Sequence, residues 1–190
     1  MKKTIQELCV EYGCDKTPEI THSYSLDYDR LFKDLKNVTK VLEIGVGYPA
    51  LMNKYINQKE RKYNYKTGVS LYIWREYFPE AMIYGIDIHP DAVVEGEERI
   101  KTFLGNSTDA EWVKKFGEEF GPFDIIIEDG SHHLVDQIKT AQNFLPYVKD
   151  GGMYFTEDLR YFREMIANFP GRELEMLGGG RDDRLLLIRC

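Results

Sequence analysis

The sequence lacks any long apolar run, and this limits the classes of protein that it can encode. Within its 190 residues, no segment has the roughly 20 consecutive apolar residues that a membrane-spanning helix needs. The opening MKKTIQELCV has two lysines but not the apolar stretch of a secretory signal. We therefore expect a cytoplasmic protein that acts without a membrane partner.

Cysteines are few, and their spacing excludes a cysteine-based metal site. Cys9, Cys14 and Cys190 are an odd number, and none belongs to a CxxC pair. Free thiols in a reducing compartment are therefore the expected state of all three side chains.

The sequence also lacks the excess of basic residues that nucleic-acid binding requires. Lysine and arginine together number 25 against 32 aspartates and glutamates, which gives a formal net charge of −7. We interpret the basic run at 59–62 as a solvated loop and expect no nucleic-acid partner. A hydrophobic content of 43%, with 13% aromatic residues, excludes a disordered chain and supports one domain over residues 1–190.

The most informative segment is VLEIGVGYP at 41–49, which joins a short apolar strand to a glycine turn. Its aliphatic residues are typical of a parallel strand that is buried on both faces. Gly45 and Gly47 allow the backbone to turn sharply and to approach a ligand without an intervening Cβ. The segment therefore predicts a cofactor-binding turn.

The spacing after this turn argues against a dinucleotide cofactor. An NAD fingerprint has a third glycine and an acid about 20 residues later. Here YPA follows the second glycine, a polar insertion occupies residues 48–68, and the next strand with a terminal acid ends only at Asp87. Four residues instead resemble the first two motifs of class I S-adenosylmethionine methyltransferases. They are the acid and the two glycines of the turn and the acid that ends the next strand: Glu43, Gly45, Gly47 and Asp87.

Beyond this segment, apolar strands and amphipathic helices alternate, as in an open parallel sheet. The last two strands are joined by GGGRDD and predict an antiparallel hairpin. We therefore expect a Rossmann-like α/β class I methyltransferase fold: a seven-stranded, mostly parallel sheet with a C-terminal antiparallel hairpin and helices on both faces. The expected strands are 40–45, 81–88, 100–104, 123–129, 153–157, 173–177 and 184–189, and the expected helices are 70–78, 109–120, 134–148 and 158–168.

The N-terminal segment, residues 1–37, precedes the first core strand and is expected to cap the cofactor crevice. It has helical periodicity at Ile5, Leu8 and Val10. Ligands of such sheets bind outside the carboxyl ends of the strands, where this segment can reach them.

Several predicted strands end in acids, and parallel strands bring their carboxyl ends to one edge of the sheet. Asp87 is placed to accept hydrogen bonds from both ribose hydroxyls of an adenosine; alternatively, it caps the segment that begins at His89. Asn106 and Ser107 follow the third strand and are expected to border the adenine. Asp109 fits the N-cap of the next helix as well as it fits this role.

A second acid group consists of Asp129, Glu157 and Asp158, at the ends of adjacent central strands. Hard oxygen ligands in this arrangement suit Mg²⁺, although the same carboxylates also suit caps at two helix N-termini. His132, three residues after Asp129, favours the metal interpretation. An imidazole can take a proton at neutral pH, and a metal beside it would lower the pKa of the hydroxyl that gives up this proton. His133 is the competing base.

Taken together, these motifs resemble the metal-dependent sugar O-methyltransferases of macrolide and related antibiotic biosynthesis, of the mycinamicin and tylosin type. The resemblance runs from about Tyr12 to Asp158 and rests on YGCDK, HSYSLDYDRLF, VLEIGVGYP, SLYIWREYFP, YGIDI, GPFDIIIEDGSH and GGMYFTEDL. It implies S-adenosylmethionine as the methyl donor and Mg²⁺ held by Asp129, Glu157 and Asp158. It also implies that His132 deprotonates a hydroxyl of a sugar or glycan acceptor, such as rhamnose or another deoxyhexose.

The resemblance also defines the expected binding residues. Cys14 stands where the family has a threonine, which weakens any role for that hydroxyl. Lys16, His22 and Tyr24 belong to the entry segment and are expected to line the cofactor or acceptor site. From the residues alone, His22 and His89 suit surface or lid positions. The expected cofactor-binding residues are Glu43, Gly45, Gly47, Tyr48, Asp87, Ile88, Asn106, Ser107 and Asp129.

Two alternatives remain open at this point. The first is methylation of a catechol-like small molecule, for which Trp74, Tyr77 and Phe78 would furnish an aromatic slot, although their helical spacing favours a place in the core. The second is a catalytically silent nucleotide-binding module, which the clustered acids disfavour, because like charges are costly without a cation. The sequence is also compatible with a homo-oligomer and with one domain of a larger glycan-modifying protein.

Overall fold

The computed structural model describes residues 2–56, 65–180 and 183–190, in which strands and helices alternate. The strands are β1 (Lys40–Ile44), β2 (Met82–Asp87), β3 (Ile100–Leu104), β4 (Phe123–Glu128), β5 (Val148–Thr156), β6 (Glu173–Gly178) and β7 (Arg184–Arg189). The α-helices are α1 (Ile5–Tyr12), α2 (Tyr24–Phe32), α3 (Pro49–Ile56), α4 (Val69–Tyr77), α5 (Ala110–Phe120), α6 (Leu134–Phe144) and α7 (Phe162–Ile166), with short 3₁₀ turns η2 (Pro90–Ala92) and η3 (Leu145–Tyr147).

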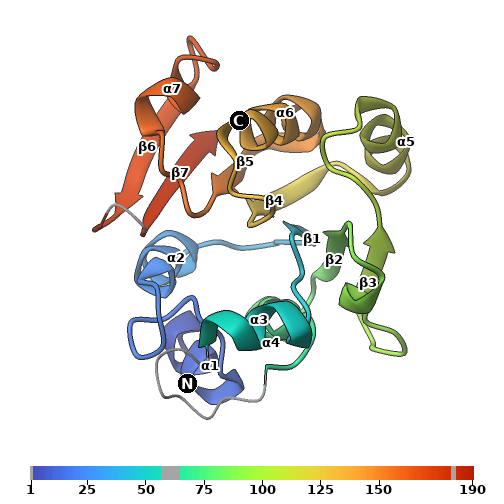
Figure 1. The fold of residues 1–190 in the computed structure, drawn as a ribbon, viewed down its shortest axis with the longest axis vertical. Helices are drawn as coiled ribbons and strands as arrows, with labels where there is room; N and C mark the ends of the chain where they lie inside the picture. The colour runs from blue at the N-terminus through green and yellow to red at the C-terminus, as the bar shows by residue number, and fades with distance from the viewer. Residues whose placement is uncertain (1, 57–64, 181–182) are drawn as a thin grey trace.

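All seven strands form one sheet in the order β3-β2-β1-β4-β5-β7-β6 (Figure 1). Neighbouring strands within the group β1 to β5 are parallel to each other, whereas β7 runs antiparallel to both β5 and β6. This order confirms the predicted class I methyltransferase fold with its C-terminal antiparallel hairpin. Within the described residues, no helix combines the length and apolar character that crossing a membrane would require.

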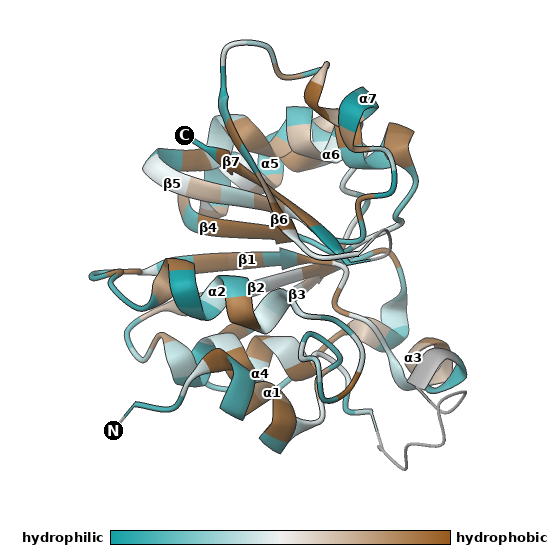
Figure 2. Cartoon of the chain, turned by 90° about the vertical axis from the view of Figure 1, so that its left-hand side faces the viewer, coloured by the Kyte–Doolittle hydropathy of each residue, from teal (hydrophilic) through white to brown (hydrophobic). Residues whose placement is uncertain are grey.

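Helices cover both faces of the sheet, with α1, α2 and α4 on one side and α5, α6 and α7 on the other (Figure 2). Successive residues of β1 show how the sequence produces these layers. Val41 packs in the apolar cluster that includes α1, α2 and α4, whereas Leu42 packs in the cluster on the opposite face. Because side chains of a strand alternate between faces, only a continuous aliphatic run can bury both.

The carboxyl ends of the central strands lie side by side. The register places Ile44 beside both Ile86 and Glu128, and Glu128 beside Thr156. Backbone hydrogen bonds continue one residue further, because the Asp129 N–H donates to the Ile44 carbonyl at 2.8 Å. The residues that follow these strands therefore share one edge of the sheet, as the sequence predicted.

Two details of the N-terminal half differ from the expectation. Val10, expected on the apolar face of the first helix, is 45% exposed, and the buried face of α1 consists of Ile5, Leu8 and Cys9. The insertion predicted at 48–68 begins with helix α3, and its residues 57–64, including the basic run at 59–62, lie outside the described residues.

The two helices predicted after β4 and β5 are shorter than expected. The helix predicted for 134–148 ends at Phe144, because Pro146 has no backbone N–H to continue it. The chain then enters β5 at Val148 rather than at 153. The helix predicted for 158–168 covers only Phe162–Ile166, because Asp158 adopts a left-handed backbone with φ of 51°.

The aromatic residues of α4 and its C-terminal end belong to the core. Trp74, Tyr77 and Phe78 are at most 5% exposed. The Trp74 ring packs edge-on against Tyr28 at 5.3 Å, and Phe78 packs against Phe32 at 5.6 Å. These residues therefore stabilise the packing of α4 against α2 and do not form a slot for an aromatic acceptor.

Replacing Gly45 with alanine should destabilise the protein strongly. Gly45 has φ of 90°, and an added Cβ would lie 1.9 Å from the Asp129 carbonyl oxygen. Positive φ costs about 1–2 kcal/mol for a residue with a Cβ, and the backbone collision adds about 1–3 kcal/mol. Urea denaturation of Gly45→Ala checks this. The matched control is Gly96→Ala, which has φ of 74° but open space around the new Cβ; an equal loss in both variants would contradict the collision.

Candidate active site

A cavity of about 870 Å³ follows the carboxyl edge of the sheet. Every residue that the sequence predicted to bind the cofactor lines it, as do Lys16, His22, His132 and Asp158. Glu157 and His133 are not among its lining residues. The structure thus brings the predicted cofactor motifs and most of the second acid group into one space.

Asp87 organises the glycine turn at one end of the cavity. Its Oδ2 accepts the N–H groups of Val46 at 2.9 Å and Gly47 at 3.1 Å, and its Oδ1 accepts the N–H of His89 at 2.8 Å. The two glycines face protein rather than open space, since a Cβ on Gly47 would lie 2.7 Å from the Tyr65 hydroxyl. The glycines are thus required for packing of the turn as well as for close approach to a ligand.

Side chains from three loops border the same end of the cavity. Tyr48 stacks on His89 with ring centroids 3.9 Å apart, and Ile88 presents an apolar side chain that is 71% exposed. Ser107 Oγ lies 2.9 Å from Thr140 Oγ1. Aromatic and apolar surfaces beside hydroxyl groups suit a nucleoside.

The two remaining predictions for this loop have different outcomes. Asn106 lines the cavity, although its Oδ1 accepts the N–H of Thr108 at 3.0 Å. Asp109 is the N-cap of α5 and accepts the N–H groups of Glu111 and Trp112 at 3.0 and 3.2 Å. The capping alternative for Asp109 is therefore confirmed.

Lys16 lines the cavity, as expected for the entry segment, and its side chain is buried among three carboxylates, which the sequence did not predict. Its side chain is 3% exposed, and its Nζ lies 2.5 Å from Asp129 Oδ2, 2.5 Å from Glu157 Oε2 and 3.4 Å from Glu43 Oε1. Glu43 lies within β1, and Asp129 and Glu157 directly follow β4 and β5. One ammonium group thus neutralises part of the charge at three strand ends.

Burial and charge move the pKa values of this network in different directions. Burial lowers the pKa of Lys16, but the attraction of Asp129 and the other carboxylates is larger and raises it well above its ordinary value. Burial raises the pKa of Asp129, but Lys16 and His132 together hold it below its ordinary value. For Glu157, burial raises the pKa more than Lys16 lowers it. Asp129 is therefore the carboxylate that retains its charge most firmly.

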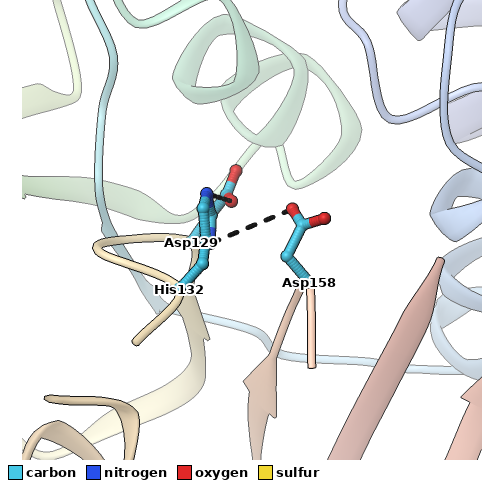
Figure 3. Close-up of side chains that lie close together, drawn as sticks. All are labelled: Asp129, His132 and Asp158. Carbon is cyan, nitrogen blue, oxygen red and sulfur yellow. Dashed lines mark ion pairs between the residues drawn. The ribbon is translucent and has the colours of Figure 1, made fainter. Parts of the chain in front are cut away.

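Asp129, His132 and Asp158 form a second group beside Lys16, with one potential ligand atom from each residue within 4.8 Å of the others (Figure 3). His132 lies between the two acids, with Nε2 at 4.0 Å from Asp129 Oδ1 and Nδ1 at 4.0 Å from Asp158 Oδ2. Both His132 and Asp158 have left-handed backbones, with φ of 56° and 51°. Such conformations are costly for residues with a Cβ and are common at functional sites.

This group fits a divalent cation. Two carboxylates supply hard oxygen ligands, which Mg²⁺ prefers. His132 Nδ1 is buried and finds no hydrogen-bond partner among the described residues, and an orphaned polar atom of this kind is consistent with an absent ligand. Glu157, the third predicted ligand, instead contacts Lys16, and its Oε1 accepts the Tyr28 hydroxyl at 2.6 Å. His133 is exposed and is the N-cap residue of α6, and of the two histidines only His132 lines the cavity.

The entry segment lines part of the cavity through Lys16 and His22, whereas Tyr24 is fully buried and is not among the lining residues. Tyr24 accepts the Asp158 N–H at 3.0 Å through its hydroxyl. His22 stacks on Tyr24 with ring centroids 4.9 Å apart and lies 3.4 Å from Asp183. His22 and His89 both line the cavity and are partly exposed, which agrees with the expected surface or lid positions.

Glu128, the last residue of β4, is a second acid that is almost fully buried. Its Oε1 accepts the Gly130 N–H at 3.1 Å, whereas Oε2 is buried without a hydrogen-bond partner in the described part of the chain. Burial raises the pKa of Glu128 to about 8, with a further contribution from Asp129. Glu128 is therefore largely protonated at neutral pH and adds no full charge to the neighbouring metal-type group.

Curated relatives of this chain are sugar O-methyltransferases. The chain is 36% identical over 171 residues to mycinamicin VI 2''-O-methyltransferase of Micromonospora griseorubida, covering 90% of this chain and 38% of that protein. It is 34% identical over 172 residues to demethylmacrocin O-methyltransferase of Streptomyces fradiae, with 90% and 38% covered. It is 37% identical over 153 residues to a rhamnosyl-tetracenomycin-C 3'-O-methyltransferase of Streptomyces olivaceus, with 80% and 36% covered.

Solved structures give the same result. The MycE methyltransferase of the mycinamycin pathway, in complex with Mg and SAH, matches with a TM-score of 0.75 at 28% identity, covering 99% of this chain and 55% of that one. A complex that also holds mycinamycin VI matches with a TM-score of 0.68 at 33% identity, covering 86% and 40%. No protein-family model matches the chain.

The sheet order and the cavity at its carboxyl edge define a class I methyltransferase fold. The chain belongs to the family of S-adenosylmethionine-dependent sugar O-methyltransferases of macrolide and polyketide biosynthesis. It spans only 36–38% of the length of these curated relatives. The activity and the acceptor named for these longer proteins are therefore taken up for this chain only as a proposal.

Replacing Glu128 with glutamine should change how stability depends on pH. Burial raises the Glu128 pKa to about 8 in the folded protein, against 4.5 for an ordinary glutamate. The contribution of protonated Glu128 to the free energy of unfolding is thus fully present below pH 4.5. It is lost as pH rises through 8, a loss of roughly 4–5 kcal/mol. Urea denaturation from pH 5 to 9 in EDTA should show that the free energy of unfolding falls less in Glu128→Gln than in the parent protein. The exposed Glu119→Gln is the control, and parallel curves for all three proteins would contradict the prediction.

Proposed function

We propose that this chain transfers the methyl group of S-adenosylmethionine to a hydroxyl of a deoxysugar, such as rhamnose, on a larger natural product. The observation that carries the proposal is that Asp129, His132 and Asp158 lie together in the same cavity as the glycine turn. The named acceptors of the relatives, mycinamicin VI and a rhamnosyl tetracenomycin, support the sugar.

In this proposal, the glycine-turn end of the cavity binds the methyl donor. Tyr48 and Ile88 border the nucleoside, and Asp87 has a carboxylate at the end of β2 where ribose hydroxyls would bind. Because Asp87 also holds the backbone of the turn, its ribose contact and the shape of the turn are coupled. Holding donor and acceptor in line replaces a bimolecular encounter and supplies much of the rate.

The acid group serves the acceptor. Mg²⁺, when bound, would supply positive charge that lowers the pKa of an acceptor hydroxyl. Asp129 and Asp158 are the ligands that the geometry supports best, and Glu157 would have to exchange a contact with Lys16 or Tyr28 to join them. His132 then accepts the hydroxyl proton as the oxygen attacks the methyl carbon, and the sulfur leaves with the bonding electrons.

The cysteines bear on where the protein acts. The three free cysteines suit a reducing compartment, so we propose a cytoplasmic enzyme. Because the chain matches only part of each relative, we propose that it acts as the methyltransferase domain of a larger glycan-modifying protein.

Calorimetric titration with S-adenosylmethionine, with and without Mg²⁺, tests the donor, and NAD is the control ligand. We expect saturable binding of the methyl donor alone. A preference for NAD, or no binding of either ligand, would contradict the proposal. An acceptor assay with a rhamnosylated polyketide and a catechol then separates the sugar from the phenolic alternative.

Replacing His132 with alanine should lower methyl transfer by about 10²–10⁴-fold, because the acceptor proton loses its base. S-adenosylmethionine affinity should change little, which distinguishes a lost base from a misfolded site. The adjacent His133→Ala is the matched control and should keep near-parental kcat. Loss of activity in His133→Ala but not in His132→Ala would reassign the base, and full activity in both would support a different mechanism.

A further inference from the structure

The backbone around Lys16 fixes where its ammonium group lies. α1 ends at Gly13, which has a left-handed φ of 73°. The carbonyl of Lys16 accepts the N–H of Ser25 at 2.8 Å, and the carbonyl of Asp15 accepts the N–H of His22 at 2.8 Å. The connection between α1 and α2 is therefore held by hydrogen bonds on both sides of Lys16, and its 3% exposed side chain is directed into the sheet edge.

This ammonium group has more negative partners than it can neutralise. Glu43, Asp129 and Glu157 carry three negative charges when ionised, against the single positive charge of Lys16. Glu43 Oε1 has no hydrogen-bond donor among the described residues, since Lys16 reaches it only at 3.4 Å. Three carboxylates thus share one buried ammonium group, an arrangement that is costly when all three are ionised.

Asp129 connects this network to the candidate metal group. Its Oδ2 accepts Lys16 Nζ at 2.5 Å, while Oδ1 faces His132 at 4.0 Å. Glu157, the predicted third ligand, has its Oε2 on the same ammonium group at 2.5 Å. Lys16 therefore contacts Asp129, a ligand in the proposed function, and also Glu157, which can join the metal only by exchanging a contact with Lys16 or Tyr28.

We propose that Lys16 is a positioning residue that acts as an internal cation and competes with the divalent metal for the carboxylates of Asp129 and Glu157. The inference rests on the metal site of the proposed function. Lys16 keeps the three strand ends together when no metal is bound, and its fixed charge limits how tightly a metal is held. A site of this kind keeps its fold while the metal exchanges.

The test is titration of Mn²⁺ alone into the whole chain, without methyl donor or acceptor, monitored by the electron paramagnetic resonance signal of free Mn²⁺. Lys16→Met keeps the length of the side chain but removes its charge. We expect Mn²⁺ to bind this variant roughly tenfold or more tightly than the parent, because a like charge a few ångströms from the metal is removed. Lys139→Met, an exposed lysine on α6, is the control and should bind as the parent does.

Each result decides a separate question. Equal or weaker binding by Lys16→Met would overturn the competition. If Lys16→Met is unfolded without metal, Mn²⁺ should restore its circular dichroism spectrum, and failure to do so would also overturn it. No Mn²⁺ binding by the parent, together with none by Lys16→Met, would instead remove the metal site of the proposed function.

Discussion

The contact of Lys16 with three carboxylates is the interaction on which the rest of the site depends. Asp129 and Glu157 follow two parallel strands and Glu43 lies within a third, so the sheet itself forces these acids together. Hydrophobic packing cannot offset that repulsion, because the groups are buried at the sheet edge. A cation delivered from outside the repeating strand and helix pattern is required, and the segment between α1 and α2 delivers it.

The glycine turn is a second consequence of the same crowded edge. The backbone after β1 passes so close to Asp129 that no Cβ fits at Gly45. Asp87 then fixes the next two N–H groups of the turn from the neighbouring strand. One backbone contact, between Gly45 and Asp129, therefore sets both the shape of the glycine turn and the position of Asp129. A shift of either segment would move the other.

The sequence was sufficient to predict the sheet and the strand-end residues, because the strand signals are local: aliphatic runs that stop at an acid or a glycine. It did not predict the buried role of Lys16, since one lysine among many has no local signal of burial. The signal that could have indicated it is Glu43, an acid inside the aliphatic run of β1, which needs a positive partner once the strand is buried. The shortened α7 was missed for a related reason, because the left-handed backbone of Asp158 depends on tertiary contacts such as the Tyr24 hydroxyl.

The residues that decide the role of each acid lie outside the strands of the sheet. The sheet brings acids to one edge in any chain of this fold, and the strands alone do not choose between a cap, a metal ligand and a counter-charge. That choice is made by Lys16 and Tyr24 from the entry segment and by His132 from the turn after β4. Because Lys16 holds one oxygen of Asp129, only the other oxygen faces His132. The N-terminal segment thus helps to decide what chemistry the sheet edge can support, and it is structurally part of the site.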